Sequence, residues 1–434
     1  MVKRRLVLLW IMGWSLGSCT GGSNAPDEEY SDTASDPDSN NDTDGVTEWN
    51  SDTDTEANTD TETDTAADTD TDTETDTDTD GETDTDTGRD DYTDTGTGTD
   101  TGTGTDTGTG TDTDTGTDTG TDTDTDTDTD SDACPLTLEG FAALNAMGQE
   151  GTYGGRDGET VTVTNQEDLE RYAEDSKPYT IRVQGNVKLE PKGKEIRVAS
   201  DKTIIGVGTS GKIEEGGFFI GDGIHNVVIR NLEIYNTYVE GDWRGKSQDY
   251  DAVQLDTAHH VWIDHCELHH HGDGIIDSRK DTTYLTVSWS ILRDHNKTFG
   301  IGWTDNVTAE ITIHHNWIRN SNQRNPSADN ILRAHLYNNF LQNIATSGNW
   351  SRGRTNMVLQ NSVFEKVNSP HFYDDGTLVA IDNIYRDTSG RQESTGSEFS
   401  FFDPGDFYDY SLDPAEEVEA LLEKCAGPRP ELGQ

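Results

Sequence analysis

The chain has 434 residues, of which only 30% are hydrophobic, and a formal net charge of −54. Residues 1–133 hold 4 Lys and Arg against 39 Asp and Glu, whereas residues 134–434 hold 27 against 46. The acidic excess therefore comes mostly from the first third, which is too polar to build a core. The overall charge therefore says little about the partner of the folded part. We expect no nucleic-acid partner.

The first nineteen residues, "MVKRRLVLLWIMGWSLGSC", combine a basic start, an apolar run and small residues ahead of Cys19. They are too short for a retained membrane span and are typical of a secretory signal. The end "LGSC" resembles a bacterial lipobox, which implies lipidation of Cys19; the alternative is an ordinary signal peptide with a cysteine near its cleavage site. Because Thr20 and not an aspartate follows, the resemblance implies the outer membrane, with the lipid as the protein's membrane contact.

Residues 20–133 form a linker of Thr, Asp and Gly repeats such as "TDTDTGTDTGTDTDTDTDTD". Without apolar side chains nothing offsets the entropy of ordering the chain, and like charges keep it extended. Calcium could bind loosely to these carboxylates, but their spacing is that of a polymer and not of a coordination loop. We expect a disordered tether that carries one globular domain, residues 134–434.

Cys134 and Cys425 bracket this domain, so they are natural disulfide partners in an oxidising compartment if Cys19 is lipidated. Sequence alone does not prove the pairing. Cys266 falls at an inward position of a strand pattern and is expected to be a small buried apolar residue.

The domain opens with a short helical pattern. Thr164 and Glu167 match a capping box, and Leu169, Tyr172 and Ala173 lie on one side of the helix that follows. We expect this helix to cover an open end of the fold, where strand edges would otherwise invite aggregation.

Seven later segments repeat one pattern, a β-branched or aliphatic run, a polar pair and a second apolar run. Their central residues are separated by steps of 34, 24, 26, 23, 23 and 22 and are Ile229, Ile263, Val287, Ile313, Leu336, Leu359 and Ile381. Units of this length without intervening helices are typical of a parallel β-solenoid. Leucine-rich repeats have a similar period, but their fixed leucine spacing is missing.

A polar column follows two residues after each central residue. Its members are Asn231, His265, Trp289, His315, Asn338, Asn361 and Asn383. Four asparagines in one column predict an internal ladder of side-chain amides at a turn. His265 and His315 are expected to be buried, hydrogen-bonded members of it.

The same alignment stacks charged residues beside one another. Asp251 and Arg324 both lie 12 residues before their central residue, Asp273 and Asp277 lie 14 and 10 before theirs, Lys297 lies 16 before, and Arg279 and Arg352 lie 8 and 7 before. We expect a lateral groove that holds carboxylates, a lysine and arginines. Three converging carboxylates repel unless a cation joins them, and oxygen ligands favour Ca²⁺; the alternative is three solvated surface acids. The many histidines do not predict zinc, because no HExxH or CxxC pattern organises them.

The blocks "SQDYDAVQLDTAHHVWIDHCEL", "DGIIDSRK", "RDHNKTFGIGWTD", "ITIHHN" and "QRNPSADNILRAHLYNN" resemble the pectate lyase family of polysaccharide lyase family 1 type. The resemblance covers roughly residues 150–385 in the correct order. It implies a right-handed parallel β-helix and calcium-assisted β-elimination of α-1,4-polygalacturonate to 4,5-unsaturated oligogalacturonates.

The resemblance also implies roles for single residues. Asp251, Asp273 and Asp277 match the calcium ligands, Asp249 matches an acid that binds further calcium with substrate, Lys297, Arg279 and Arg352 match substrate-binding positions, and Arg324 matches the catalytic base. Many relatives have a second arginine five residues after the base, where this chain has Asp329. Arg333 is a candidate to reach the same space.

An arginine base is chemically demanding. Free arginine stays protonated, so Arg324 needs cationic neighbours that favour its neutral form, and the reaction would be fastest at alkaline pH. The alternative is a structural arginine paired to Asp329.

Three other functions compete with a pectate lyase. A polygalacturonase would need an acid and a base around water, and its NTD, DD, GHG and RIK motifs are absent. A non-catalytic galacturonan binder or adhesin would not need Lys297 and Arg324 beside three acids. A pectin lyase, which acts on methylated polymer, should lack the calcium acids. We therefore expect a monomeric, calcium-dependent, secreted pectate lyase displayed on the cell surface.

Overall fold

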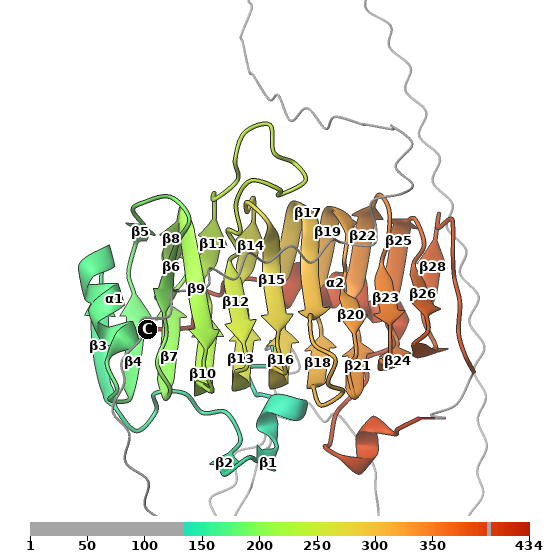
Figure 1. The fold of residues 1–434 in the computed structure, drawn as a ribbon, viewed down its shortest axis with the longest axis horizontal. Helices are drawn as coiled ribbons and strands as arrows, with labels where there is room; N and C mark the ends of the chain where they lie inside the picture. Colours follow the sequence, from blue (N-terminus) through green and yellow to red (C-terminus); the bar gives the residue numbers. More distant parts are fainter. Residues whose placement is uncertain (1–133, 397–400) are drawn as a thin grey trace, which may run out of the picture. The chain divides into compact units, whose positions relative to one another are not determined.

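The computed structural model describes residues 134–396 and 401–434. The predicted signal segment with Cys19 and the predicted linker lie outside these residues. The described chain winds into a parallel β-solenoid with three sheets (Figure 1), as the repeat spacing predicted. None of its helices is long and apolar enough to cross a membrane.

The first sheet has ten strands, one from each successive coil. They are β3 (Glu159–Val163), β4 (Tyr179–Val183), β7 (Lys202–Gly206), β10 (His225–Arg230), β13 (His259–Asp264), β16 (Thr283–Ser288), β18 (Glu310–His314), β21 (Arg333–Tyr337), β24 (Asn356–Gln360) and β27 (Thr377–Ile381).

The second and third sheets share the long strand β17. The second comprises β5 (Asn186–Lys188), β8 (Lys212–Glu214), β11 (Glu233–Tyr235), β14 (Glu267–His269), β17 (Ile291–Gly302), β19 (Trp317–Gln323), β22 (Phe340–Ile344), β25 (Val363–Val367) and β28 (Ile384–Arg386). The third comprises β6 (Lys194–Arg197), β9 (Gly216–Gly221), β12 (Val253–Asp256), β15 (Gly274–Arg279), the end of β17, β20 (Ser327–Asp329), β23 (Asn349–Arg352) and β26 (His371–Asp374).

The register of the first sheet confirms the aligned column up to its last member. The residues paired from β10 to β24 are Ile229, Ile263, Val287, Ile313, Leu336 and Leu359, and all are at most 1% exposed. The final step was wrong by one residue, because Leu359 pairs with Ala380 and Ile381 pairs with Gln360. The column also begins earlier than predicted, with Ile181 and Ile204 in β4 and β7.

The predicted asparagine ladder exists one residue further along each coil. Six of the seven residues of the predicted column have positive φ values, such as 58° at Asn231 and 49° at Asn338, and the amides of its first three asparagines donate to backbone carbonyls. The seventh, Asn383, is a member of the ladder as predicted, because the last coil is one residue out of step. The ladder that links coil to coil runs through Ser290, Asn316, Asn339, Ser362 and Asn383. A left-handed turn residue favours asparagine for its conformation, and so does an amide ladder, which is why the two columns were confused.

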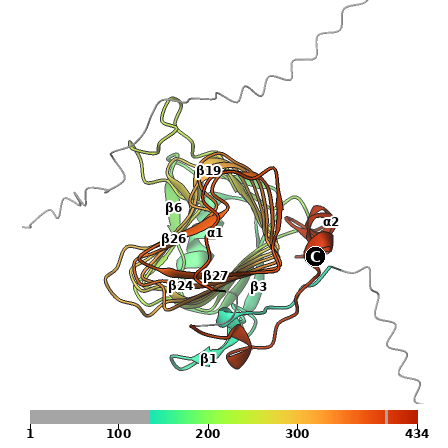
Figure 2. The ribbon, with the colours of Figure 1, turned by 90° about the vertical axis from the view of Figure 1, so that its right-hand side faces the viewer.

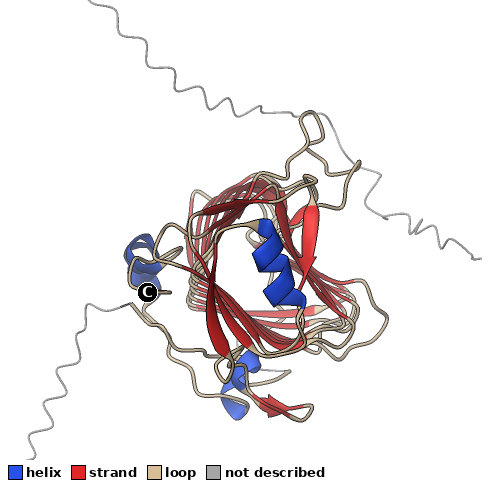
Figure 3. Cartoon of the chain, turned by 90° about the vertical axis from the view of Figure 1, so that its left-hand side faces the viewer, coloured by secondary structure: helices blue, strands red, loops and turns tan. Residues whose placement is uncertain are grey.

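Helix α1 (Gln166–Glu174) closes one end of the solenoid, as predicted (Figure 3). Leu169 and Ala173 are fully buried against the core. The predicted cap was wrong: Asn165 is the N-cap, and its side chain accepts a hydrogen bond from the Asp168 N–H at 2.9 Å. Asparagine satisfies the same free N–H groups that Thr164 was expected to satisfy.

The C-terminal segment, residues 401–434 and here called the arm, follows the corner between the first and second sheets. It contains η2 (Pro404–Asp406) and α2 (Ala415–Cys425). In the end view, α2 and the C terminus lie on the side opposite β6 and β26 of the third sheet (Figure 2). Near the domain's start, η1 (Phe141–Ala143) precedes the antiparallel pair β1 (Asn145–Ala146) and β2 (Gln149–Glu150).

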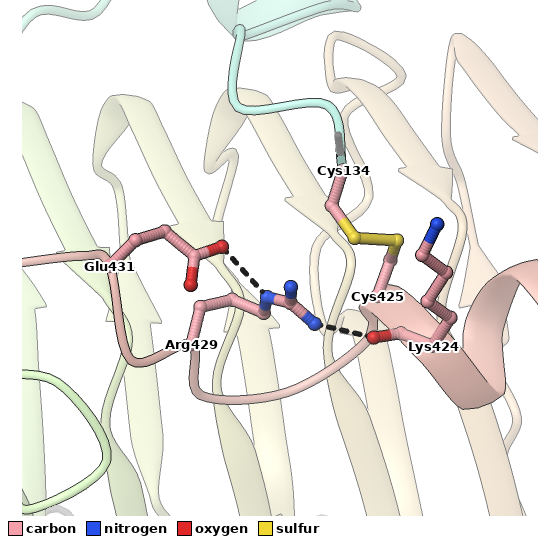
Figure 4. Close-up of a disulfide and its surroundings, with 5 residues drawn as sticks. All are labelled: Cys134, Lys424, Cys425, Arg429 and Glu431. Atoms are coloured by element: carbon pink, nitrogen blue, oxygen red, sulfur yellow. Dashed lines mark hydrogen bonds and ion pairs between the residues drawn. A yellow bond between two sulfur atoms is a disulfide. The ribbon is translucent and has the colours of Figure 1, made fainter. Parts of the chain in front are cut away.

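A disulfide joins Cys134 to Cys425 at the end of α2, with the two Cα atoms 5.5 Å apart (Figure 4). Arg429 binds the Lys424 carbonyl and the Glu431 carboxylate beside it. The bond ties together residues separated by 291 positions. Cys266 is free and fully buried, as predicted.

Candidate active site

The third sheet gathers four aspartates from two adjacent coils. Asp249 and Asp251 precede β12, Asp273 precedes β15 and Asp277 lies within it. Oxygen atoms of Asp249, Asp251 and Asp273 all lie within 4.8 Å of one another. The adjacent Gly274 N–H donates to Asp251 Oδ1 at 2.6 Å. We call these four residues the acid cluster.

Burial makes the acid cluster electrostatically unfavourable on its own. Asp251 and Asp277 are 1% and 4% exposed. Burial, with the charges of Asp277, Asp249 and Asp273, raises the pKa of Asp251 well above its usual value. Burial and Asp273 likewise raise the pKa of Asp277 to about 7, against the opposing effect of Arg324 and Arg279. A cation between these carboxylates would relieve both effects.

Lys297 reaches the acid cluster from β17. Its backbone pairs with Gly274 of β15, and its side chain forms an ion pair with Asp273. Its ammonium nitrogen also lies 3.4 Å from the Gly245 carbonyl, in the segment that connects β11 to β12. The lysine is therefore held at the acid cluster from two sides.

Arg279 is the last residue of β15, and aspartates hold its guanidinium beside the acid cluster. Its Nε donates to Asp256 Oδ1 at 2.9 Å, and its Nη1 lies 3.5 Å from Asp249 Oδ2. Gln254 lies between Arg279 and Glu195, and its amide satisfies both when it is turned so that the oxygen faces the guanidinium and the nitrogen lies 3.2 Å from Glu195 Oε1. Burial, Asp249 and Asp256 raise the pKa of Glu195 to about 7.

Arg324 lies between β19 and β20 with a φ of 61°. Its backbone carbonyl accepts from the Phe299 N–H at 2.7 Å, which fixes the turn against β17. Burial raises the pKa of both Asp273 and Asp277, and the charge of the Arg324 guanidinium opposes that rise in each.

The two other candidate arginines, Arg352 and Arg333, lie on different sheets of the solenoid. Arg352 in β23 pairs in register with Asp329 in β20, and its guanidinium lies 4.4 Å from the Trp350 ring centroid. Arg333 belongs to the first sheet, where it forms an ion pair with Glu310. The suggestion that Arg333 replaces the second arginine was wrong, because β21 lies on another side of the solenoid.

Residues 131–416 match the family model described as pectate lyase. This chain belongs to the pectate lyase family. It is 42% identical to a pectate trisaccharide-lyase of Thermotoga maritima over 209 residues, 46% of this chain and 56% of that protein. It is 31% identical to a pectate trisaccharide-lyase of Bacillus licheniformis over 311 residues, 67% of this chain and 86% of that protein.

Solved structures agree with this family. A pectate lyase from Bacillus sp. N165, crystallised with trigalacturonate, is 26% identical with a TM-score of 0.55, covering 67% of this chain and 98% of that chain. The cedar pollen allergen jun a 1 has a TM-score of 0.54 at 19% identity, covers 66% of this chain and 92% of that chain, and shows the fold alone. The chain spans little more than half the length of the Thermotoga protein.

The acid cluster of this chain fits calcium. All of its donors are carboxylate oxygens, the ligands that hard cations prefer, and burial has left them with unfavourable charge. Asp249, Asp251, Asp273 and Asp277 are the residues that would hold the ion.

Several site residues were missed in the sequence. Glu195, Gln254 and Asp256 surround Arg279, and Trp303 lies beside Arg324. Glu195 belongs to a coil that precedes the aligned segments, so no register existed to place it. Gln254 and Asp256 lie at alternate positions of β12, and that alternation was a usable signal.

Proposed function

We propose that the domain cleaves α-1,4-polygalacturonate by β-elimination. The observation that carries this proposal is the placement of Lys297 and Arg324 against a buried acid cluster on one sheet of the solenoid. A binding module has no need to bury Asp251 and Asp277 among further acids and beside two cations, since that arrangement destabilises the fold.

The cations are spaced for a polyanion. Arg279, Lys297, Arg324 and Arg352 belong to four successive coils, those of β15, β17, β20 and β23. Successive strands of a sheet are about 4.8 Å apart. One cation per coil suits a chain that carries one carboxylate on every sugar, and this supports a polyuronate as the substrate.

The chemistry requires a proton to leave C5 of a uronate, next to its carboxylate. Lys297 would bind that carboxylate and stabilise the negative charge that builds on it in the transition state. Calcium in the acid cluster would supply further positive charge and weaken the hold of the carboxylates on protonated Arg324. A guanidine nitrogen of Arg324 would accept the C5 proton, and the bond to O4 would break to leave a 4,5-unsaturated sugar.

The product length is a further part of the proposal. Two relatives are named pectate trisaccharide-lyases, and one similar structure holds trigalacturonate. We propose unsaturated oligogalacturonates with the trisaccharide prominent among them. Their masses would be read directly by mass spectrometry of the digest.

We also propose secretion and anchoring through a lipid on Cys19, with the monomeric domain carried outside the cell on residues 20–133. The Cys134–Cys425 disulfide supports an oxidising location. Metabolic labelling with a fatty acid would test the lipid, with Cys19→Ser as the control that should remove the label.

The decisive experiment incubates the protein with polygalacturonate, with and without a calcium chelator. We expect ultraviolet absorbance from the unsaturated product, lost in chelator and restored by added calcium. Reducing ends without this absorbance would indicate a hydrolase, and binding without either would indicate a non-catalytic module. Faster reaction on methylated polymer, insensitive to chelator, would indicate a pectin lyase.

A further inference from the structure

Trp303 is an exposed aromatic residue at the centre of the candidate active site. The last eight residues of β17 are buried, yet the tryptophan that follows them is 49% exposed. Single exposed apolar side chains are common on proteins, so exposure alone assigns it no role. Its position relative to the acid cluster and Arg324 does.

The indole lies over Gly300 on the floor of the third sheet. Gly300 pairs with Asp277 on one side and Ser327 on the other. A β-carbon on Gly300 would lie 2.3 Å from Trp303 Cη2 and 2.9 Å from Asp277 Oδ1. In the next two coils the position of Asp277 is taken by the small residues Gly300 and Ser327. The Trp303 ring occupies the space above them.

Arg324 borders the same ring. Its guanidinium carbon lies 5.7 Å from the Trp303 ring centroid, within the range of a cation–π contact. Gly302, immediately before Trp303, has a φ of 130°, and a β-carbon there would lie 2.6 Å from the Asp329 carbonyl oxygen. The turn that presents the indole is thus fixed by a residue that must be glycine.

We propose that Trp303 is a sugar-stacking residue that sets the position of the galacturonate ring at the cleavage site. The apolar C–H face of a pyranose ring would pack on the exposed face of the indole, whose π-electrons attract C–H groups. With the ring in this place, its carboxylate would face Lys297 and its C5–H would face Arg324. This inference rests on the proposed function and names how that site holds its sugar.

The experiment compares Trp303→Leu, which removes the aromatic face, with Trp303→Phe, which keeps one. Trigalacturonate binding is measured by calorimetry at fixed calcium, in an Arg324→Lys background that limits turnover. KM and kcat on polygalacturonate are measured in the enzyme that keeps the native Arg324. We expect Trp303→Leu to raise Kd and KM roughly 3- to 10-fold, and Trp303→Phe to recover most of that loss.

Trp317→Phe is the matched control. Trp317 also stacks on an arginine, Arg319, at 4.3 Å, but in β19 of the second sheet, so its Kd and KM should not change. The proposal would be overturned if trigalacturonate bound with the same Kd whether residue 303 is Trp or Leu. It would also be overturned if Trp303→Leu and Trp303→Phe raised Kd and KM equally. An enzyme that binds trigalacturonate through Trp303 but forms no unsaturated product would instead refute the proposed function.

Discussion

The polar groups buried under the arm and those buried in the acid cluster differ in whether their surroundings satisfy them. Under the arm, His335 is fully buried between the Tyr408 hydroxyl at 2.6 Å and Gln360 Oε1 at 2.9 Å. A neutral imidazole satisfies both partners, one as acceptor and one as donor. In the acid cluster, Asp251 and Asp277 are buried beside other carboxylates.

The difference shows which buried polar groups serve the fold and which serve the site. Burial lowers the pKa of His335 to about 3 and raises that of Asp277 to about 7, so the neutral form is favoured in both. The hydrogen bonds of His335 need only that neutral form. The acid cluster must be charged to hold a cation, so its arrangement opposes stability and is explained by function.

The largest effect is expected at Arg324, the proposed base beside the acid cluster. Arg324→Lys keeps the positive charge but cannot place a planar guanidine nitrogen at C5. Loss of a positioned base lowers the rate roughly 10²- to 10⁴-fold, so kcat should fall while trigalacturonate binding persists. Near wild-type turnover in this variant, together with complete loss in Lys297→Ala, would move proton removal away from Arg324.

Asp277→Asn separates function from stability within the acid cluster. It should lower activity on the order of 10²-fold or more through weaker calcium and transition-state charge stabilisation. It also removes a buried charge beside Asp251 and Asp273, so thermal unfolding in calcium-free buffer should occur at the same or a higher temperature. A matched Asn339→Ala change in the amide ladder should do the reverse, with lower stability and normal kcat. A large drop in the melting temperature of Asp277→Asn would show that the acid cluster supports the fold.

These contrasts also mark what the sequence could predict. Apolar residues such as Ile263 and Leu336 recur at nearly constant spacing because each coil must bury one, so their register was readable. The last coil is one residue out of step, since Gln360 pairs with Ile381. Spacing cannot distinguish such a shift from a shorter loop. The ladder was displaced for a related reason, because asparagine suits the turn and the ladder equally.

The sequence predicted the position of a site residue where the stacking of successive coils alone determines it. Asp251, Asp273 and Lys297 follow from the alignment of coils. Trp303 and Glu195 do not, because their positions depend on a turn and on a coil outside the aligned repeats.

A smaller effect is expected on the pH dependence of the free energy of unfolding, through His335 under the arm. Because the pKa of His335 is about 3 in the folded protein and about 6.5 when unfolded, the unfolded chain binds more protons between these values. The free energy of unfolding should therefore fall as pH drops below about 6.5, by up to about 1.4 kcal/mol per pH unit from this residue. Urea unfolding at pH 7 and pH 5 measures the slope. His335→Gln should reduce it, and an unchanged slope in that variant would assign the effect to other groups.

The smallest expected effect is that of deleting residues 20–132. The acid cluster, Lys297 and Arg324 all lie in coils from β12 to β20, and Cys134 is held to α2 on the side of the solenoid away from the third sheet. The Thr, Asp and Gly side chains of residues 20–132 have no means of completing that site. We expect the disulfide-bonded 133–434 fragment to keep kcat and KM on soluble polygalacturonate within about twofold, which is less than 0.5 kcal/mol. Steady-state assays of both proteins at equal calcium provide the test, with circular dichroism to confirm equal folding. A large loss of activity in a folded fragment would mean that the acidic repeats contribute to catalysis, for instance by supplying calcium to the acid cluster.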